Sequence, residues 1–380
     1  MSTASDARLH GARMSVPATM ESRRPAARPI GGFFPLDLGP AAGPGVPVAA
    51  RWFEGSTCRG YANARSALGL GLLSGRDTIR TLWMPGFLCA AMGRVAESAL
   101  RRRTVETVAR YPLAASGSLS PDPAFLDAKL REGDAVLAVD YFGQPPAPEF
   151  RELVARRRDV LWIEDRAGAL WPGDPWGDAL LYSPRKLLGV PDGGYLVLPP
   201  ASRFGAPDPG PPPGTGAIAP LLPALLRFED PEEADNDTWF AFHRAREAGE
   251  TLEARGPSHL TDVLLRRLDL SAMAVRRVAN RSVLLRRLPP ALRDGVCGPT
   301  PHVSDWVPQG VPVLVPDADA VARRMAAERV FCPVIWPDMD DPGPCARSAG
   351  LAGRVLLLPC DHRYGTADME RVAGALLRAL

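Results

Sequence analysis

The sequence predicts an α/β fold around a mostly parallel sheet, and three observations support it. From about residue 60 onward, short apolar runs typical of buried strands alternate with stretches of helical periodicity. The 380 residues, 46% of them hydrophobic, are enough for a large core and for two lobes. A short turn-forming connection, 184–193, also indicates one antiparallel strand in the sheet.

The first lobe is expected to contain six strands, each an apolar run bounded by turn residues: 78–85, 103–111, 134–142, 160–166, 178–183 and 194–199. Helical stretches at 61–73, 89–103 and 148–158 lie between these runs. The connection 184–193 contains "VPDGG" and is too short for a crossover helix. The strand 194–199 should therefore run antiparallel to its neighbour.

We expect a mobile tail over 1–30, a large α/β domain over 31–250 and a smaller C-terminal α/β domain over 251–380. The proline- and glycine-rich stretch 199–223 should be an extended loop. Arginine pairs in the helical region 240–290 are typical of solvated helix faces. In the smaller domain we expect strands at 310–317, 331–336 and 354–360, a helix at 318–330, and a closing helix from Thr366 with Met369, Val372, Leu376 and Leu380 on one face.

Composition excludes several classes of function. The net charge of +2 does not favour binding to nucleic acid or to an anionic membrane, and no apolar run is long enough to cross a bilayer. The first twenty residues lack the apolar core of a secretory leader. Six cysteines without a CxxC pair argue against a zinc knuckle and for free thiols in a reducing compartment. These features predict a cytoplasmic protein.

Lysine is scarce in this chain. Of 45 cationic residues only Lys129 and Lys186 are lysines, so the other 43 are arginines. A lysine that must lose its proton and form a covalent bond cannot be replaced by arginine, because a guanidinium stays protonated. Lys129 lies at the polar end of an amphipathic helix, which favours a solvated position. Lys186 follows the strand 178–183 and is the candidate for chemistry.

Residues suited to pyridoxal 5′-phosphate (PLP) follow the ends of the predicted strands, where ligands gather in open α/β sheets. Lys186 can form a Schiff base with the cofactor aldehyde. Asp165, at the end of an apolar strand, can face the pyridine nitrogen. The helix start at Ala64 and Arg65 offers amides to a phosphate, and Ser66 and Ser183 offer hydroxyls.

Six blocks follow one another as in PLP enzymes of fold type I: ARSALGLGLL, LWMPGFLCAAM, AVDYFGQP, IEDRAGAL, LYSPRKLLGVPDGGYLVLP and LPCDHRYGTADMERV. They most resemble the DegT/StrS-type aminotransferases, many of which aminate nucleotide-linked keto-sugars. The resemblance covers residues 30 to 380. It implies an aspartate-aminotransferase-like fold, with a large mixed, mostly parallel sheet domain and a smaller domain. It also implies a homodimer with active sites at the subunit boundary.

The resemblance also implies roles for single residues. Lys186 would be the Schiff-base lysine and Asp165 the partner of the pyridinium nitrogen. Phosphate would be held by Ser183, Ser66 and the amides of Ala64 and Arg65. Ring stacking would come from Phe87, although the alignment equally allows Cys89. Gly168 stands where the family usually carries Gln or His beside the phenolic oxygen of the cofactor.

The expected reaction is a ping-pong transamination from an amino-acid donor to a small keto substrate, with a keto-sugar among the candidates. Arg363 is the candidate clamp for the donor carboxylate, and Gln144 is a second candidate for substrate binding. His243 and His362 are expected to be structural.

Three alternatives stay open. The Ser183-x-x-Lys186 spacing also occurs in penicillin-binding proteins and β-lactamases, but these need a second lysine in a Lys-Thr-Gly block. A PLP enzyme of the same fold could instead catalyse decarboxylation, elimination or carbon–carbon bond formation. A catalytically idle member of the fold would bind the cofactor or a partner without turnover.

Overall fold

The computed structural model describes residues 27–39, 55–74, 78–115, 119–170, 174–200, 202–212, 221–230, 236–249, 252–298, 306–339, 343 and 345–380. The tail predicted over 1–30 lies outside these residues, apart from its last four. The described part of the predicted loop 199–223 has neither helix nor strand before Leu222. Within the described ranges, no helix has both the length and the apolar character needed to cross a membrane.

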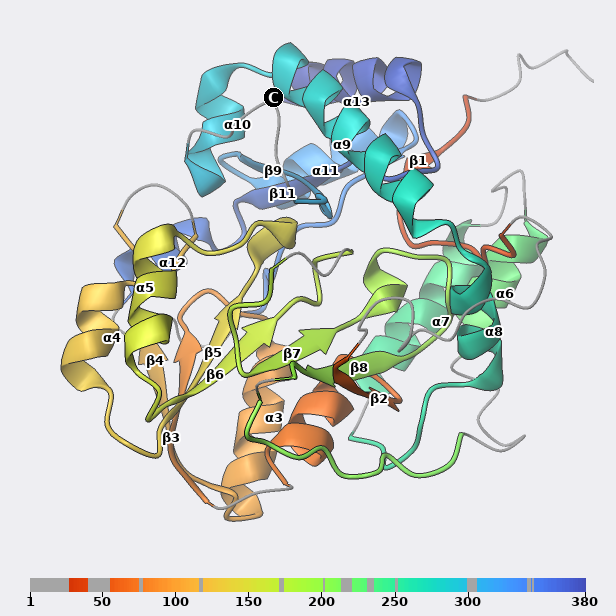
Figure 1. The fold of residues 1–380 in the computed structure, drawn as a ribbon. Helices are drawn as coiled ribbons and strands as arrows, with labels where there is room; N and C mark the ends of the chain where they lie inside the picture. Colours follow the sequence, from red (N-terminus) through yellow and green to blue (C-terminus); the bar gives the residue numbers. More distant parts are fainter. Residues whose placement is uncertain are drawn as a thin grey trace, which may run out of the picture.

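The centre of the molecule is a seven-stranded sheet with the order β2-β8-β7-β6-β5-β3-β4 (Figure 1). Neighbouring strands from β3 to β7 are parallel, whereas β8 is antiparallel to both β7 and β2. The antiparallel strand predicted after "VPDGG" is thus confirmed. The strands are β2 Thr57–Tyr61, β3 Ile79–Pro85, β4 Val105–Tyr111, β5 Ala135–Val139, β6 Leu161–Asp165, β7 Ala179–Tyr182 and β8 Gly194–Leu198.

Helices cover both faces of this sheet because its strands are apolar on both sides. Leu137 and Ile163 face a core shared with α3, whereas Val136 and Trp162 face a core shared with α4 and α5. Figure 1 shows α3 apart from the α4–α5 pair. The helical segments against the sheet are α2 Ala64–Ser66 with the π-helix Ala67–Leu72, α3 Ala90–Arg101, α4 Pro123–Lys129, α5 Pro148–Arg156 and α8 His259–Arg267.

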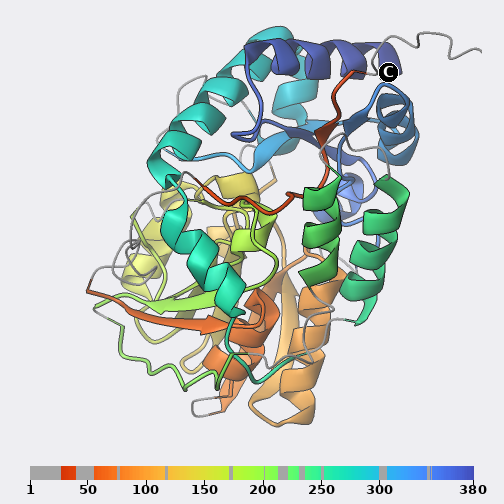
Figure 2. The same cartoon turned by 90° about the vertical axis from the view of Figure 1, so that its right-hand side faces the viewer.

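A smaller lobe is built on β9 (Gly310–Leu314), which pairs antiparallel with β11 (Val355–Pro359). A separate two-stranded sheet joins distant parts of the chain. In it, β1 (Ile30–Gly31) runs parallel to β10 (Val330–Phe331). The segment after β1 runs from this lobe toward the large sheet (Figure 2). The remaining helices are α6 Leu222–Glu229, α7 Asn236–Gly249, α9 Leu270–Arg287, α10 Pro290–Cys297, α11 Ala318–Ala327, α12 Ala346–Leu351 and α13 Thr366–Ala379.

The change from one core to the other occurs within α9. Leu264 and Leu265 of α8 pack against β7 and β8, whereas Leu284 and Leu285 of α9 pack with β9 and β11. Packing thus changes later in the chain than the predicted boundary at residue 251.

Several predicted elements differ from the structure. The strand predicted at 134–142 ends at Val139, because Phe142 has a left-handed φ of 58° in the following turn. Where a strand was predicted at 331–336, the structure has the two-residue strand Val330–Phe331 and an isolated bridge from Val334 to Leu356. Met369, Val372 and Leu376, predicted to share one face of α13, are all buried, whereas Leu380 follows the end of the helix and is exposed.

The arginine-rich helix α9 also corrects a prediction. Arg276, Arg286 and Arg287 are exposed, as a solvated face requires. Arg277 and Arg281 are instead fully buried, and Arg277 reaches across to the large lobe, where it bonds to Leu187 O. The spacing of arginine pairs cannot separate these two groups, because which helix face is covered depends on the lobe packed against it.

Gly194, the first residue of β8, allows the sheet to lie against the start of α2. A β-carbon at Gly194 would lie only 2.1 Å from Ala64 N and from the carbonyl carbon of Asn63. Gly193 beside it has a φ of 97°, which favours glycine. Gly194 therefore sets the distance between β8 and the helix start, while Gly193 allows the turn before it.

We predict that Gly194→Ala destabilises the fold by about 2–3 kcal/mol or more, because main-chain atoms of Asn63 and Ala64 must move. Urea unfolding followed by circular dichroism measures the change. Gly205→Ala is the matched control, because no atom lies within 4 Å of its β-carbon position. Equal stabilities of the two variants would contradict the prediction.

Candidate active site

A cavity of about 690 Å³ lies at the carboxyl ends of the central parallel strands. Its lining includes Asp140 after β5, Asp165 at the end of β6 and Ser183 after β7. Asn63, which caps α2, also lines this cavity. Ligands bind at this edge of an open α/β sheet, so topology and cavity agree.

Lys186 projects into the cavity from a short 3-10 turn, Pro184–Lys186. Lys186 N donates to Ser183 O at 3.0 Å, and Leu187 N donates to Pro184 O at 2.9 Å. Proline suits the first position of such a turn because that position needs no N–H donor. The backbone of Lys186 is thus fixed, while its side chain is exposed.

Asp165 lies in the same cavity, as predicted. Its Oδ1 accepts a hydrogen bond from Ala167 N at 2.9 Å, and the residue is 7% exposed. Burial raises the pKa of the Asp165 carboxyl, and the positive charge of Lys186 lowers it in part. A cationic partner near the carboxyl would therefore favour its ionised form.

The start of α2 presents main-chain amides to the cavity. Asn63 Oδ1 accepts from Ser66 N at 2.9 Å, and Ala64 and Arg65 line the cavity. The first N–H groups of a helix have no acceptor within the helix, so they can bind an anion. Ser183 also lines the cavity. Ser66 is fully buried outside the lining, and its Oγ accepts from Glu253 N at 2.9 Å.

Arginines, some of them not predicted from the sequence, add positive charge to this cavity. Arg65, Arg94 and Arg185 all line it beside Lys186, and Glu247 of α7 pairs with Arg185 at 2.9 Å. Burial lowers the pKa of the Arg65 guanidinium, and the charge of Arg185 lowers it further. Such surroundings favour a bound anion.

Sequence reasoning missed the side chains of Arg94, Arg185 and Glu247. Arg185 adjoins the lysine, which was a usable signal. Arg94 and Glu247 lie on helices far away in sequence and give no local signal.

The place of the missing side chain at Gly168 is taken by Gln309 of the small lobe. A β-carbon at Gly168 would lie 2.8 Å from Gln309 Oε1. Gln309 lines the cavity, and its N–H donates to Phe142 O at 2.8 Å. An amide side chain is therefore present on this wall, although it comes from a segment that the sequence did not indicate.

Besides Ser66, three further predicted site residues lie outside the lining. Phe87 is fully buried and packs on Tyr141, whereas Cys89 lines the cavity instead. Gln144 is half-buried and does not reach the cavity. Arg363 turns toward its neighbour Asp361, with a Nε–Oδ1 distance of 2.8 Å.

The two histidines expected to be structural also lie outside this lining. His243 packs against the ring of Phe33, and burial lowers its pKa to about 4. His362 stacks on Phe34, with ring centroids 5.7 Å apart.

The opposite face of β6 carries a separate group of buried charges. Arg166 Nε lies 3.3 Å from a Glu164 oxygen and 3.4 Å from an Asp140 oxygen. Trp176 covers the group, since its N donates to Glu164 Oε2 and its Nε1 to Asp140 Oδ1. Asp140 thus borders the cavity, but its carboxylate points away from it.

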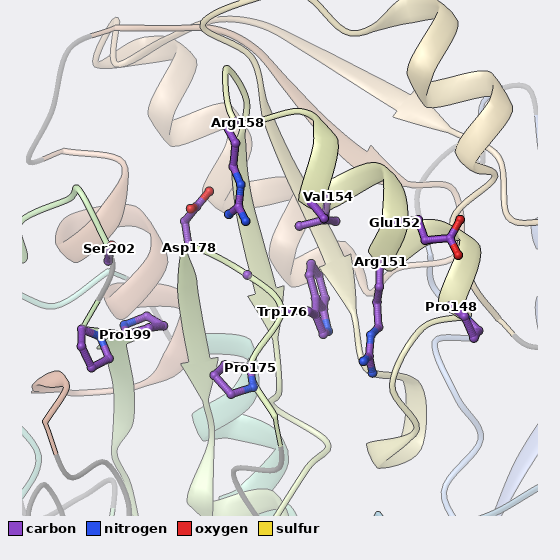
Figure 3. Close-up of a pocket in the computed structure, with 13 residues that line it drawn as sticks. Pro148, Arg151, Glu152, Val154, Arg158, Pro175, Trp176, Asp178, Pro199 and Ser202 are labelled. Carbon is purple, nitrogen blue, oxygen red and sulfur yellow. The ribbon is translucent and has the colours of Figure 1, made fainter.

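A second cavity, of about 810 Å³, lies at the other end of the strands (Figure 3). Asp178, which precedes β7, and Pro199, which follows β8, line it together with Trp176. Its cations, Arg151 and Arg158, are exposed. It contains neither lysine, so we assign the chemistry to the cavity around Lys186.

The residues around Lys186 fit PLP by their chemistry. An exposed primary amine, a buried carboxylate and a cationic helix start line one cavity. Among the described residues, no cluster of His, Cys, Asp or Glu has the arrangement of a metal site.

Comparison with known proteins gives a fold but no sequence relative. No protein-family model matches the chain, and no curated protein matches it. Solved structures do match. A DegT DnrJ EryC1 StrS aminotransferase from Brucella abortus is 16% identical, with 84% of this chain and 85% of that chain covered and a TM-score of 0.55.

Two further structures agree with this match. DesV from S. venezuelae, solved with a ketimine intermediate, is 19% identical over 84% of each chain, with a TM-score of 0.56. The PLP form of Spr1654 from Streptococcus pneumoniae, a protein assigned as a sugar aminotransferase, is 13% identical. It covers 85% of this chain and 88% of that chain, with a TM-score of 0.57. The chain therefore has the fold of these aminotransferases.

Proposed function

We propose that this protein is a PLP-dependent aminotransferase of the DegT/StrS type. It would transfer an amino group from an amino-acid donor to a small keto substrate of the keto-sugar class. The observation that carries the proposal is that Lys186, Asp165 and the first residues of α2 line one cavity. The structural neighbours, which include aminotransferases and a PLP-bound form, support it.

Lys186 has two tasks in this proposal. Its amine would hold the cofactor aldehyde and, when free, would carry a proton to and from the donor α-carbon. PLP, when bound, supplies an electron sink that stabilises negative charge at that carbon. The rigid turn and the exposed side chain of Lys186 suit both tasks, because the backbone stays fixed while the amine moves.

Asp165 would hold the proton on the pyridine nitrogen. Its carboxyl is buried and keeps one hydrogen bond, from Ala167 N. An ion pair with a pyridinium would offset the cost of this burial, which otherwise raises the carboxyl pKa. The carboxylate would therefore stabilise the protonated ring.

The cofactor phosphate and the donor carboxylate are both anionic, and the cavity contains groups that can bind them. The amides of Ala64 and Arg65 and the hydroxyl of Ser183 would hold the cofactor phosphate. The donor carboxylate would bind to a cavity arginine such as Arg185 or Arg94 rather than to Arg363.

We also propose that the protein works as a cytoplasmic homodimer with active sites at the subunit boundary. Phe228, Phe240 and Phe242 of the α6–α7 hairpin are each more than a third exposed. Exposed aromatic residues are typical of protein interfaces. The hairpin also supplies Glu247 to the cavity, so a partner on it would lie near the site.

Lys186→Met is expected to abolish covalent attachment of PLP. The purified protein is incubated with PLP and reduced with borohydride, and the labelled peptide is identified by mass spectrometry. Lys129→Met is the matched control, because Lys129 is exposed on α4 and lies outside the cavity lining. Label on Lys129 instead of Lys186, or a wild-type protein that takes none, would contradict the proposal.

Asp165→Asn should retain the cofactor but lower kcat by about 10²–10³-fold, because the neutral amide no longer stabilises the protonated ring. The amino-donor half-reaction, followed by visible absorbance, measures this loss. Glu164→Gln is the control, since this neighbouring acid faces the opposite side of the sheet. A similar loss in both variants would mean that Asp165 acts only through stability.

Arg363→Ala should leave the donor KM within about twofold, because Arg363 lies outside the cavity. It should instead lower stability. Burial raises the pKa of Asp361, but Arg363 overcomes this and holds it at about 2.

The stability from the Arg363–Asp361 pair is therefore fully present above an unfolded pKa near 3.9 and is lost as the pH falls through about 2. The variant should lose about 2 kcal/mol at pH 7 and little near pH 2, as measured by urea unfolding. A large rise in donor KM would restore Arg363 to the site.

A further inference from the structure

A fully buried arginine, Arg277 of α9, connects two walls of the cavity. Its side chain is 0% exposed, although its neighbour Arg276 is exposed. Burial lowers the pKa of the Arg277 guanidinium. Burying a guanidinium costs several kcal/mol unless its N–H groups find acceptors. The acceptors of Arg277 therefore indicate what the side chain does.

These acceptors are main-chain carbonyl oxygens on both sides of the lobe junction. Arg277 Nη2 donates to Leu187 O at 2.6 Å, directly after Lys186. Arg277 Nη1 donates to the carbonyls of Pro308 and Gln309 at 3.2 and 3.3 Å, just before β9. One guanidinium therefore holds both the turn that carries the lysine and the loop that carries Gln309.

Both of these segments place a side chain in the cavity. Lys186 enters from one segment, and Gln309 enters from the other, beside Gly168. The loop is held a second time from the large lobe by the bond from Gln309 N to Phe142 O. Without Arg277, the Lys186 turn would lose this side-chain link to the loop, so the amine and the amide could move apart.

We propose that Arg277 is a positioning residue, which fixes the Lys186 turn against the Gln309 loop and so sets the direction of the lysine amine. The inference rests on the proposed function, in which that amine binds the cofactor. An apolar side chain could fill the same space but could not join two main-chain segments. The planar guanidinium reaches both in one fixed geometry, which preorganises the site.

The test compares Arg277→Met with Arg281→Met, a matched control from the same helix. Arg281 is 1% exposed, and its guanidinium lies 4.5 Å over the ring of Trp306. Each variant loses one buried cation. Circular dichroism and urea unfolding establish that each variant is folded and how stable it is.

The readout is the reactivity of the two lysines in the protein without cofactor. A trace of acetic anhydride labels both amines, and mass spectrometry gives the ratio of Lys186 to Lys129 labelling across pH. Exposed Lys129 is the internal standard. In Arg277→Met the ratio should change by about threefold or more, since amine reactivity follows local contacts and solvation. In Arg281→Met it should stay within about twofold.

Arg277→Lys should shift the ratio in the same direction by less, because an ammonium can reach Leu187 O but cannot span both walls. This variant provides the measurement if Arg277→Met does not fold. A wild-type ratio in the folded Arg277 variants, or an equal shift in Arg281→Met, would overturn the inference.

Borohydride trapping of PLP on the wild-type protein separates this inference from the proposed function. If wild-type Lys186 takes no label, the proposed function fails, while the labelling ratio still decides whether Arg277 positions the amine. If Lys186 takes label and the Arg277 variants keep the wild-type ratio, only the positioning role fails.

Discussion

The site depends on the alternation of side chains along β6. Successive residues of a strand face opposite sides of a sheet, so the adjacent acids Glu164 and Asp165 are separated by the backbone itself. Asp165 opens into the cavity with Lys186, whereas Glu164 meets a guanidinium on the closed face. Ile163 and Trp162, buried in different cores, hold the strand in this register. A shift by one residue would bring the wrong acid into the cavity.

The sequence was sufficient for six of the seven strands of the large sheet, because β3 to β8 are largely apolar runs bounded by turn residues. The edge strand β2 was not predicted, because its residues Thr57–Tyr61 are mostly polar or small and only partly buried. The antiparallel β8 followed from the shortness of the connection before Gly194. Lys186, Asp165 and the start of α2 were expected together because parallel strands end at one edge of a sheet. Local pattern and topology are enough for such residues, since each directly follows a strand or begins a helix.

The other parts of the site depend on tertiary packing that local patterns do not record. Gln309 and Arg277 reach the cavity region from the small lobe, and neither stands in a pattern that indicates chemistry. Arg363 was assigned to the site, but Asp361, two residues earlier, holds it. Phe87 was preferred over Cys89, yet the chain turns there, and strand alternation no longer decides which side chain faces inward.

The pairing of β1 with β10 has a consequence for biosynthesis. Ile30 lies opposite Val330, and the guanidinium of Arg363 reaches the carbonyls of Gly32 and Phe33. A ribosome releases the first of these strands long before its partner exists. The hydrogen-bonding groups of β1 therefore stay without their β10 partners during synthesis. The small lobe can fold completely only when nearly all of the chain has left the ribosome.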